Sequence, residues 1–369
     1  MTQLETHSLK IAIIGSGLAG CLAARILREQ HTVTIYEREA TRIETAAAIN
    51  LGPNAVQILD GVGFDRGRAC SIPVTRSLSY NKRGEKTGES VVDYKKEYGA
   101  DWLFHHRADL RDELLRLATA PSEELGLKGR PAEVVYGARV VGGMLKRGPA
   151  GTSAFRFTMT REKVVEILGG VPEVLDSSKP ACMTGVYALD PTERRVVIYP
   201  CRNYQILNFA IIVPDSMLKS TPTDSWSAPG DRDELVSLFT DFPDWVLAYF
   251  RAAENIKLWQ LREQDPLPTY IRGRTVLVGD AAHAMTPHQG QGGSQAIEDA
   301  EGFRLLLGEH VTRHNVSSIL EDFDRVRRPR ASQIQRNTSE ATGRYSAKEV
   351  WRFRRLNWTY PGILEGLEE

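Results

Sequence analysis

The first residues that could do chemistry form a glycine-rich turn near the start of the chain. Gly15, Gly17 and Gly20 have the spacing GxGxxG in the segment GSGLAG. In such a turn the first glycine permits the tight bend, the second lets the backbone approach a pyrophosphate, and the third lets helix and strand pack closely. Glu37 follows about 20 residues later, where a carboxylate accepts hydrogen bonds from an adenosine ribose, with Arg38 next to it. We therefore predict a dinucleotide site here, and the charge of Glu37 argues against NADPH as its occupant.

A second glycine-rich segment that could hold a ligand lies far along the chain, in GDAAH at Gly279–His283 and the glycine-rich run after it. We call the GSGLAG turn and this segment the two cradles. Asp280 can accept hydrogen bonds from ribityl hydroxyls. Gly290, Gly292 and Gly293 leave room for a flavin ring and present backbone N–H groups to its polar edge. A dehydrogenase that uses NAD needs no second cradle, whereas a long ligand with two different ends does. The two cradles together therefore predict FAD.

The histidines and cysteines do not form a metal-binding pattern. His283 and His288 are five residues apart, which is the wrong spacing for two ligands on one helix face. The chain has four cysteines, without CxxC spacing: Cys21, Cys70, Cys182 and Cys201. Their wide separation also argues against a dense disulfide scaffold and fits a reducing compartment. We expect no metal and a cytoplasmic location.

The composition excludes several other functions. The chain has 369 residues, of which 41% are hydrophobic and 25% charged, with a formal net charge of zero. This balance gives no field that would gather nucleic acid or anionic lipid, and the basic run at 325–330 is interpreted as the solvated face of a helix. No segment has the roughly 18 apolar residues that a membrane span needs. We expect neither nucleic acid nor membrane as a partner, and the sequence does not indicate an oligomeric state.

The elements that must position the cradles follow from the pattern of apolar residues. A buried strand is predicted at Lys10–Ile14, then a helix to about Gln30 and a second strand at Val33–Tyr36. This βαβ unit is typical of a parallel sheet. Further helices are predicted at Pro53–Leu59 and Arg107–Leu125.

The middle of the chain changes to a strand pattern. Strands are predicted at Phe155–Thr158, Cys182–Leu189, Arg195–Pro200 and Gln205–Val213, followed by helices at Asp231–Thr240 and Pro243–Glu254. A buried strand returns at Thr275–Val278, and long helices run from about Gln291 to the end. We therefore expect an α/β fold: a Rossmann-like parallel sheet built from residues 1–145 and 269–369, an inserted, mainly antiparallel substrate domain at 146–268, and C-terminal helices.

The pair GSGLAG…YER and VLVGDAAHAMTPHQGQGGSQAIEDA resembles the single-component FAD-dependent aromatic monooxygenases of the salicylate hydroxylase and p-hydroxybenzoate hydroxylase kind, especially the fungal type. The resemblance spans nearly the whole chain. It implies that Arg107, in the HRxxL segment, contacts FAD, and it adds Ala48 and Pro287 to the cofactor site. From the residues alone, Arg107 could instead be only an arginine at a helix N-terminus, and Asp280 only a helix cap.

The resemblance also implies the reaction. NADPH or NADH supplies electrons to FAD, and reduced FAD reacts with O2 to give a flavin hydroperoxide. One oxygen atom then passes to a small phenolic or aromatic-acid substrate. A role in secondary metabolism is one option. A cation that favours the phenolate, or a phenolic donor that orients it, is what the protein must contribute. Arg156 and Tyr187 match the catalytic residues of fungal relatives. The alternative is that Arg156 pairs with a surface acid and Tyr187 packs in the core.

One departure from the family stands out. Relatives have a strand–turn–strand and then a buried strand that ends in a GADGxxSxxR-like segment, whereas here Val134–Val141 leads through Gly142–Gly151 directly into SAFRF. The loss would remove a strand from the parallel sheet and leave its neighbours with unpaired backbone groups. Three accounts stay open: an incompletely assembled coding sequence, a protein that binds FAD but reduces it poorly, or substitution by Gly142–Gly151. A flavin-binding relative without full activity is therefore the alternative function, and a flavin oxidase or dehydrogenase is a third.

Overall fold

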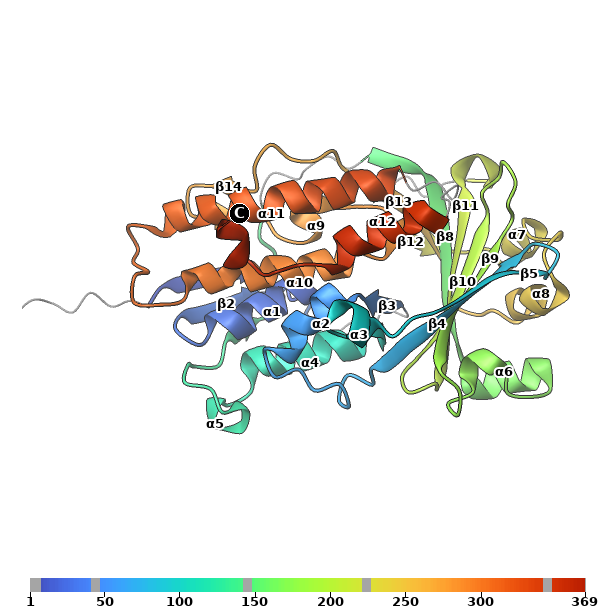
Figure 1. Cartoon of the computed structure of the whole chain (residues 1–369), viewed down its shortest axis with the longest axis horizontal. Coiled ribbons are helices and arrows are strands. Elements are labelled where there is room, and N and C mark those ends of the chain that lie inside the picture. The colour runs from blue at the N-terminus through green and yellow to red at the C-terminus, as the bar shows by residue number, and fades with distance from the viewer. Residues whose placement is uncertain (1–7, 41–46, 142–147, 221–226, 341–346, 369) are drawn as a thin grey trace, which may run out of the picture.

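The computed structural model describes residues 8–40, 47–141, 148–220, 227–340 and 347–368, without the side chains of 227 and 347–351. A helix-rich half and a half dominated by a large sheet lie against each other along the long axis of the molecule (Figure 1). The α/β fold expected from the sequence is confirmed. The sheet-dominated half is formed mainly by the middle of the chain, as the colours of Figure 1 show.

The predicted βαβ unit is present. Strand β1 (Lys10–Ile14) leads into helix α1 (Leu18–Leu27), and β2 (Thr32–Tyr36) lies parallel to β1. Strand β7 (Glu133–Val135) adds to the other side of β2, which gives a parallel sheet of order β1-β2-β7. The sheet places the end of β1 and the start of α1 at the same edge, where a Rossmann-type fold binds its ligand.

Strand β1 has a bare edge in the part of the chain that the structure describes. Its ladder to β2 uses every second residue: the N–H of Thr32 donates to the carbonyl of Leu9 (2.9 Å), and the N–H of Gly15 donates to the carbonyl of Tyr36 (2.8 Å). The intervening residues of β1 direct their backbone groups to the opposite edge, where no described strand pairs with them. Ile14 is 59% exposed, although β1 is an apolar run. The unpaired edge expected from the missing segment is therefore present.

A second, larger sheet makes up most of the sheet-dominated half. Its order is β12-β13-β8-β11-β10-β9-β4-β6-β3, with β5 paired to β4. Most neighbours are antiparallel, but β4 and β9 are parallel. The strands are β3 (Ala48–Leu51), β4 (Ile72–Asn81), β5 (Lys86–Val91), β6 (Trp102–His106), β8 (Gly148–Thr160), β9 (Ala181–Tyr187), β10 (Arg195–Cys201), β11 (Ile206–Pro214), β12 (Ser227–Pro229) and β13 (Lys257–Glu263).

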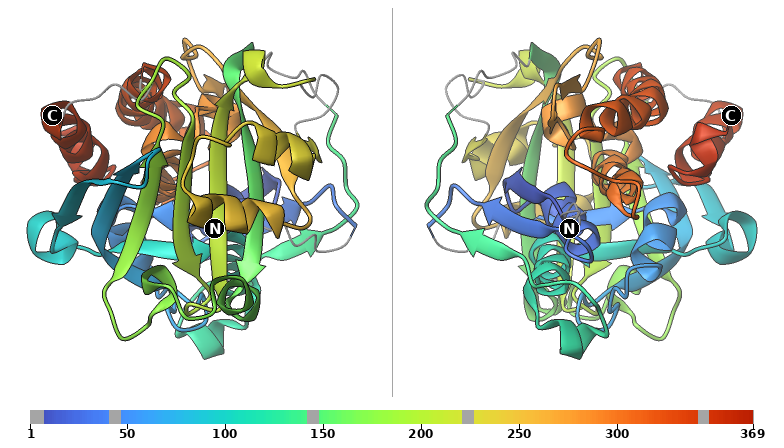
Figure 2. Two further views of the ribbon diagram at one scale, coloured as in Figure 1. Left: turned by 90° about the vertical axis from the view of Figure 1, so that its right-hand side faces the viewer. Right: turned by 90° about the vertical axis from the view of Figure 1, so that its left-hand side faces the viewer.

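The two faces of this sheet differ because side chains alternate along each strand. On one face, Phe155, Phe157 and Phe209 pack in an apolar core with helices α6 (Arg161–Leu168), α7 (Arg232–Ser237) and α8 (Asp244–Arg251). Figure 2 (left) looks onto this face and shows helices in front of the strands. The alternate residues point to the helix-rich half, so this second face is free to line a cavity.

The remaining helices gather in the other half. They are α2 (Pro53–Asp60), α3 (Tyr94–Tyr98), α4 (Arg107–Thr119), α5 (Ser122–Leu125), α9 (Asp280–His283), α10 (Gly292–Gly302), α11 (Val316–Ser339) and α12 (Ala347–Trp358). The helix predicted at Arg107–Leu125 is broken into α4 and α5, because Pro121 cannot continue the first helix. A short hairpin, β14 (Ile271–Arg272) with β15 (Thr275–Val276), precedes α9.

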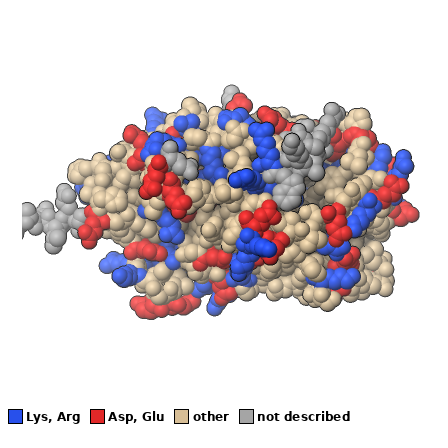
Figure 3. Space-filling view, in the orientation of Figure 1, with Lys and Arg blue, Asp and Glu red and all other residues tan. Residues whose placement is uncertain are grey.

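On the face that Figure 3 shows, basic and acidic side chains are interspersed, and neither charge forms a large patch of its own. Within the described ranges, no helix combines the length and the apolar character needed to cross a membrane.

Candidate functional site

A cavity of about 2210 Å³ lies between the two halves, and residues from β1, the glycine-rich turn, β3, the large sheet, the 274–296 segment and α12 line it. Pockets for a single small ligand usually measure about 300–1,000 Å³, so this one has room for more than one group. Ten predicted cofactor residues line the cavity: Gly15, Gly17, Gly20, Ala48, Arg107, Asp280, Pro287, Gly290, Gly292 and Gly293. So do Arg156 and Tyr187. Neither Glu37 nor Arg38 is among the residues found to line it.

The three glycines of the first turn have different surroundings. Gly15 adopts φ +96°, which disfavours any other residue. A Cβ on Gly17 would meet nothing within 4 Å and would enter the open cavity. A Cβ on Gly20 would overlap the carbonyl oxygen of Gly15, so the third glycine lets α1 pack on the turn. With the N-terminus of α1 beside it, this turn fits a pyrophosphate.

Glu37 acts on the turn through Ser16. Its carboxylate accepts hydrogen bonds from the Ser16 N–H (2.8 Å) and hydroxyl (2.5 Å), and from the N–H of Glu39 (3.0 Å). Burial would raise the pKa of Glu37, but these hydrogen bonds and Arg111 lower it overall. Arg111 also donates to the Ser16 carbonyl (2.9 Å) and hydroxyl (2.6 Å). Sequence reasoning missed Arg111, although it lies one helical turn after Arg107.

Arg38 points away from this arrangement. Its guanidinium forms an ion pair with Glu39 at 3.0 Å, and its side chain is 71% exposed. The structure therefore gives Arg38 surface contacts, and its place in the cofactor site stays a prediction.

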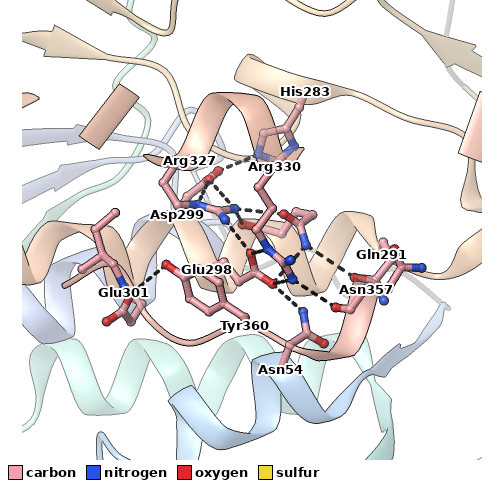
Figure 4. Close-up of polar contacts among 12 residues, drawn as sticks. Asn54, His283, Gln291, Glu298, Asp299, Glu301, Arg327, Arg330, Asn357 and Tyr360 are labelled. Carbon is pink, nitrogen blue, oxygen red and sulfur yellow. Dashed lines mark hydrogen bonds and ion pairs between the residues drawn. The ribbon is translucent and has the colours of Figure 1, made fainter. Parts of the chain in front are cut away.

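Buried charged side chains stabilise the second cradle, and Figure 4 shows the network that they form. Gly279 adopts φ +58°, and its N–H donates to the carboxylate of Asp299 at 2.8 Å. The same carboxylate contacts Nε2 of His283 at 2.6 Å and a guanidinium nitrogen of Arg327 at 3.0 Å. Burial alone would raise the pKa of Asp299, but His283 and Arg327 hold it at about 2. The ionised carboxylate thus fixes the backbone turn that presents Asp280 to the cavity.

The network continues along α10. Glu298, fully buried, accepts from Arg327 (2.5 Å), from Arg330 (2.8 Å) and from the side chain of Asn54 (2.7 Å). Burial would raise the pKa of Glu298, but the two arginines lower it overall. Asn54 lies in the first turn of α2, the helix after β3, so the ion network joins α10 and α11 to the segment that carries Ala48 (Figure 4). Buried charges of this kind are tolerated only when they are paired and hydrogen-bonded.

The glycines after Asp280 make room for β3 as well as for the cavity. A Cβ on Gly290, which has φ +64°, would lie 2.8 Å from the side chain of Asn50. A Cβ on Gly293 would lie 2.6 Å from the side chain of Ile49. These close approaches place β3 directly against the glycine-rich run.

On the sheet face, Arg156 and Tyr187 line the cavity from β8 and β9. Nε of Arg156 is buried without a hydrogen-bond partner in the described residues, and its guanidinium lies 6.0 Å from the ring of Trp259. Burial lowers the pKa of Arg156, and Tyr199 partly offsets this. A Cβ on Gly185 would lie 2.5 Å from the ring and hydroxyl of Tyr187, so this ring lies over the glycine.

The sheet face has a second cationic corner that sequence reasoning missed. Arg195 lies opposite Tyr187 in the register of β10 and β9, and its guanidinium donates to Nδ1 of His288. Arg354 from α12 also lines the cavity and influences the pKa of Tyr187. The sequence contained a signal for Arg195. Arg195 and Tyr199 lie an even number of positions apart in one predicted strand, so their side chains point to the same face of the sheet.

The cavity as a whole is strongly basic. Among the described residues, its only acidic lining side chain is Asp280, against a set of cations: Lys10, Arg107, Arg156, Arg195, Arg274, Arg313 and Arg354. The same residues contain no group of three or more His, Cys, Asp or Glu that could hold a metal ion. A bent glycine turn beside a helix N-terminus, a carboxylate at the second cradle and surrounding cations together fit the pyrophosphate and ribityl groups of FAD.

Comparisons with known proteins agree with this reading. A family model described as "FAD binding domain" matches residues 147–338. The chain is 26% identical to hispidin-3-hydroxylase from Neonothopanus nambi, covering 90% of this chain and 88% of that protein. It is 27% identical to a salicylate hydroxylase from Pseudomonas putida, covering 92% and 87%. That second alignment extends over 395 residues, more than the 369 of this chain, so the relative contains residues without a counterpart here.

Solved structures share the fold. A salicylate hydroxylase in complex with substrate has a TM-score of 0.75 at 22% identity and covers 98% of both chains. HpxO from Klebsiella pneumoniae, complexed with FAD and uric acid, has a TM-score of 0.70 at 20% identity, covering 98% of this chain and 93% of that one.

Proposed function

The chain belongs to the FAD binding domain family, and from this we propose that it is an FAD-dependent monooxygenase that hydroxylates a small phenolic or aromatic-acid substrate with NAD(P)H and O2. One observation carries the proposal: a single cavity joins both glycine-rich cradles to a sheet face that presents Arg156 and Tyr187. Relatives named as hydroxylases of hispidin and salicylate support an aromatic substrate, and fungal relatives support a role in secondary metabolism.

The proposed cofactor contacts follow from the two cradles. The Gly15–Gly20 turn would hold the pyrophosphate, Asp280 the ribityl hydroxyls, and Arg107 would add positive charge near both. Bound FAD would supply the transfer of two electrons from NAD(P)H and the activation of O2. Overall, one oxygen atom is inserted into a C–H bond of the aromatic ring, and the other is reduced to water by the hydride of NAD(P)H and a proton.

The chain's own contribution on the substrate side is charge and position. Nε of Arg156 is buried without a hydrogen-bond partner in the described residues, and burial lowers the pKa of this arginine, so an anion beside it is favourable. A phenolic substrate that loses its proton beside Arg156 would provide this anion, and the phenolate is the more reactive form of the ring. The hydroxyl of Tyr187 can donate a hydrogen bond that orients the substrate.

A second candidate is a protein that binds FAD but reduces it slowly. The bare edge of β1 favours this candidate, because the turn that would hold the pyrophosphate follows directly from a strand with an unpaired side. Weak packing at this edge of β1 would impair binding of NAD(P)H near the first cradle. It would affect the second cradle less, because the buried ion network holds that segment.

A spectrum of the purified protein and two variants test these proposals. We expect a bound-flavin absorbance spectrum, NAD(P)H consumption that a phenolic acid stimulates, and incorporation of one ¹⁸O atom from ¹⁸O2 into the product. Arg156→Ala should abolish product while FAD stays bound, whereas Arg251→Ala, at an exposed position of α8, should change neither. Flavin that NAD(P)H does not reduce would support the second candidate. A colourless protein that ignores added FAD would refute both.

We also propose a cytosolic location. All four cysteines are free thiols, and burial raises the pKa of Cys21 to about 12, which keeps this thiol protonated and unreactive. Free thiols are typical of a reducing compartment. Localisation of a tagged chain would test this.

A further inference from the structure

Arg195 is a partly buried charge at the cavity wall, and no carboxylate in the described chain forms an ion pair with it. Its hydrogen-bond partner among the described residues is Nδ1 of His288. Glu193, on the turn before β10, acts on Arg195 through its field. Burial lowers the pKa of Arg195, and the fields of Tyr187 and Glu193 offset this only in part. Proteins normally pair a charge in such a position, so an anion from outside the chain is the expected partner.

His288 is set up to assist such an anion and cannot replace it. Because Arg195 donates to Nδ1, this nitrogen is the acceptor and Nε2 carries the proton. Burial lowers the pKa of His288 to about 3, with Arg195 adding to the effect, so the ring is neutral at physiological pH. A neutral imidazole offers Arg195 no negative charge, but its Nε2–H is a further donor at the cavity wall.

The sheet register separates this corner from Arg156. Arg195 pairs across β10 and β11 with Ile212, and Ile212 pairs with Ala154 of β8. Arg156 is therefore two residues further along and two strands away, roughly 12 Å between Cα atoms for strands about 4.8 Å apart with a rise of about 3.3 Å per residue. Two arginine side chains reaching inward over that span can contact opposite ends of one aromatic ring.

The surface between the two arginines is apolar, so the flat face of such a ring can pack on it. It is formed by Ala154, Val197, Ala210 and Ile212, which all line the cavity. Tyr187 lies over Gly185, and Gly185 pairs with Val197 in the same row as Ala210. The tyrosine hydroxyl therefore extends from the Arg195 corner toward the row that contains Arg156.

We propose that Arg195, assisted by His288, binds a carboxylate on the aromatic substrate, while Arg156 faces the ring position that carries the phenol. This inference rests on the proposed function and narrows its substrate class to aromatic acids that carry a phenolic group away from the carboxylate. A guanidinium and a carboxylate form paired, charge-assisted hydrogen bonds, which gives both affinity and orientation. Arg195 is thus a specificity-determining residue.

Binding of matched ligands to the FAD-loaded protein tests the inference. The probes are 2-, 3- and 4-hydroxybenzoate and the corresponding hydroxybenzamides, and the readout is quenching of tryptophan fluorescence, since Trp102 and Trp358 line the cavity. We expect at least one acid to bind the wild type about 10- to 100-fold more tightly than its amide, the range for one charge-assisted contact. Arg195→Gln should remove this preference with less than threefold change for the amide. Arg195→Lys should restore part of it, and His288→Gln should reduce it by a smaller factor.

The outcomes separate the inference from the proposed function. If acids and amides bind the wild type equally, or if no acid binds, the inference is overturned, whatever the protein hydroxylates. The same holds if Arg195→Gln, with an unchanged circular dichroism spectrum, keeps the acid preference. If the preference depends on Arg195 but no hydroxylated product forms with any probe, the carboxylate site stands and the monooxygenase proposal fails. If Arg195→Gln does not fold, the Arg195→Lys variant decides, because it keeps the charge and loses the paired geometry.

Discussion

Asp299 is the residue whose replacement should separate cofactor-site geometry from general stability. Its carboxylate is fully buried and accepts from Gly279, His283 and Arg327. Asp299→Asn keeps the shape of the side chain and removes the charge. An asparagine can still accept one of these hydrogen bonds, but its NH2 group must then face one of the three donors.

The expected loss follows from the ionisation of Asp299. The pKa of Asp299 lies at about 2, below the usual value of 3.8 for an aspartate, and each pKa unit corresponds to about 1.4 kcal/mol in favour of the charged form. Together with a buried donor left without its partner, we expect the free energy of unfolding to fall by about 3–5 kcal/mol, the range for breaking a buried ion pair. Since the folded-state pKa is depressed, the stabilisation is complete above about pH 4 and is lost as the pH falls toward 2.

Glu301→Gln on the same helix is the matched control. Glu301 is also buried and accepts from the Tyr360 hydroxyl (2.9 Å) and the N–H of Ile363 (3.0 Å), but burial raises its pKa. The charged form of Glu301 therefore gains no net stabilisation from its surroundings, and the amide should change stability by about 1 kcal/mol or less. Urea unfolding followed by circular dichroism gives the stabilities, and titration with FAD gives the dissociation constants.

We expect Asp299→Asn to weaken FAD binding at least tenfold at a urea concentration where both variants are folded, because Gly279 loses the acceptor that fixes its turn. Equal stability and equal FAD affinity for the two variants would refute the idea that ionised Asp299 holds the second cradle.

Two further predictions concern the sheet edge and the substrate face. The amides of Ala12 and Ile14 face the bare edge of β1 and should exchange with deuterium at least tenfold faster than that of Ile13, which faces β2; equal protection measured by NMR would show that something pairs with this edge. Gly185→Ala should displace the tyrosine ring that lies over it, lowering product formation at least tenfold while the melting temperature and FAD content hardly change; unchanged kinetics would mean that the position of this ring is unimportant.

Local patterns were enough to predict the elements that carry the cofactor. The strand at Lys10–Ile14 is confirmed residue for residue, because a short apolar run before GxGxxG has few other structures available. The strands from Arg195 to Pro214 were also predicted to within a residue or two, since their alternation is strong. Each of these elements is specified by its own residues.

The strands β3, β4, β5, β6 and β13 were not predicted. For β4 and β13 the physical reason is that they have partners distant in sequence: β4 pairs in parallel with β9, and β13 pairs with β8. Polar residues such as Arg76 and Ser77 interrupt the apolar pattern of β4, because one side of this strand faces solvent and the cavity rather than a core. A strand of this type is stabilised by its neighbours in the sheet, and a single sequence does not reveal them.

The buried ion network could not be assembled from the sequence either, yet it explains how the protein can hold a cofactor beside a bare strand. The pyrophosphate turn depends on β1, whose one edge is unpaired, so this end of the site should open most easily. The second cradle depends little on strand pairing: among the described strands β15 pairs with β14 alone, and Gly279 is fixed by Asp299. Arg327 links that carboxylate to Glu298, and Glu298 binds Asn54 beside β3. We therefore expect the flavin end of FAD to be held firmly and the adenosine end loosely, which would make FAD affinity, rather than the fold, the property most affected by the missing segment.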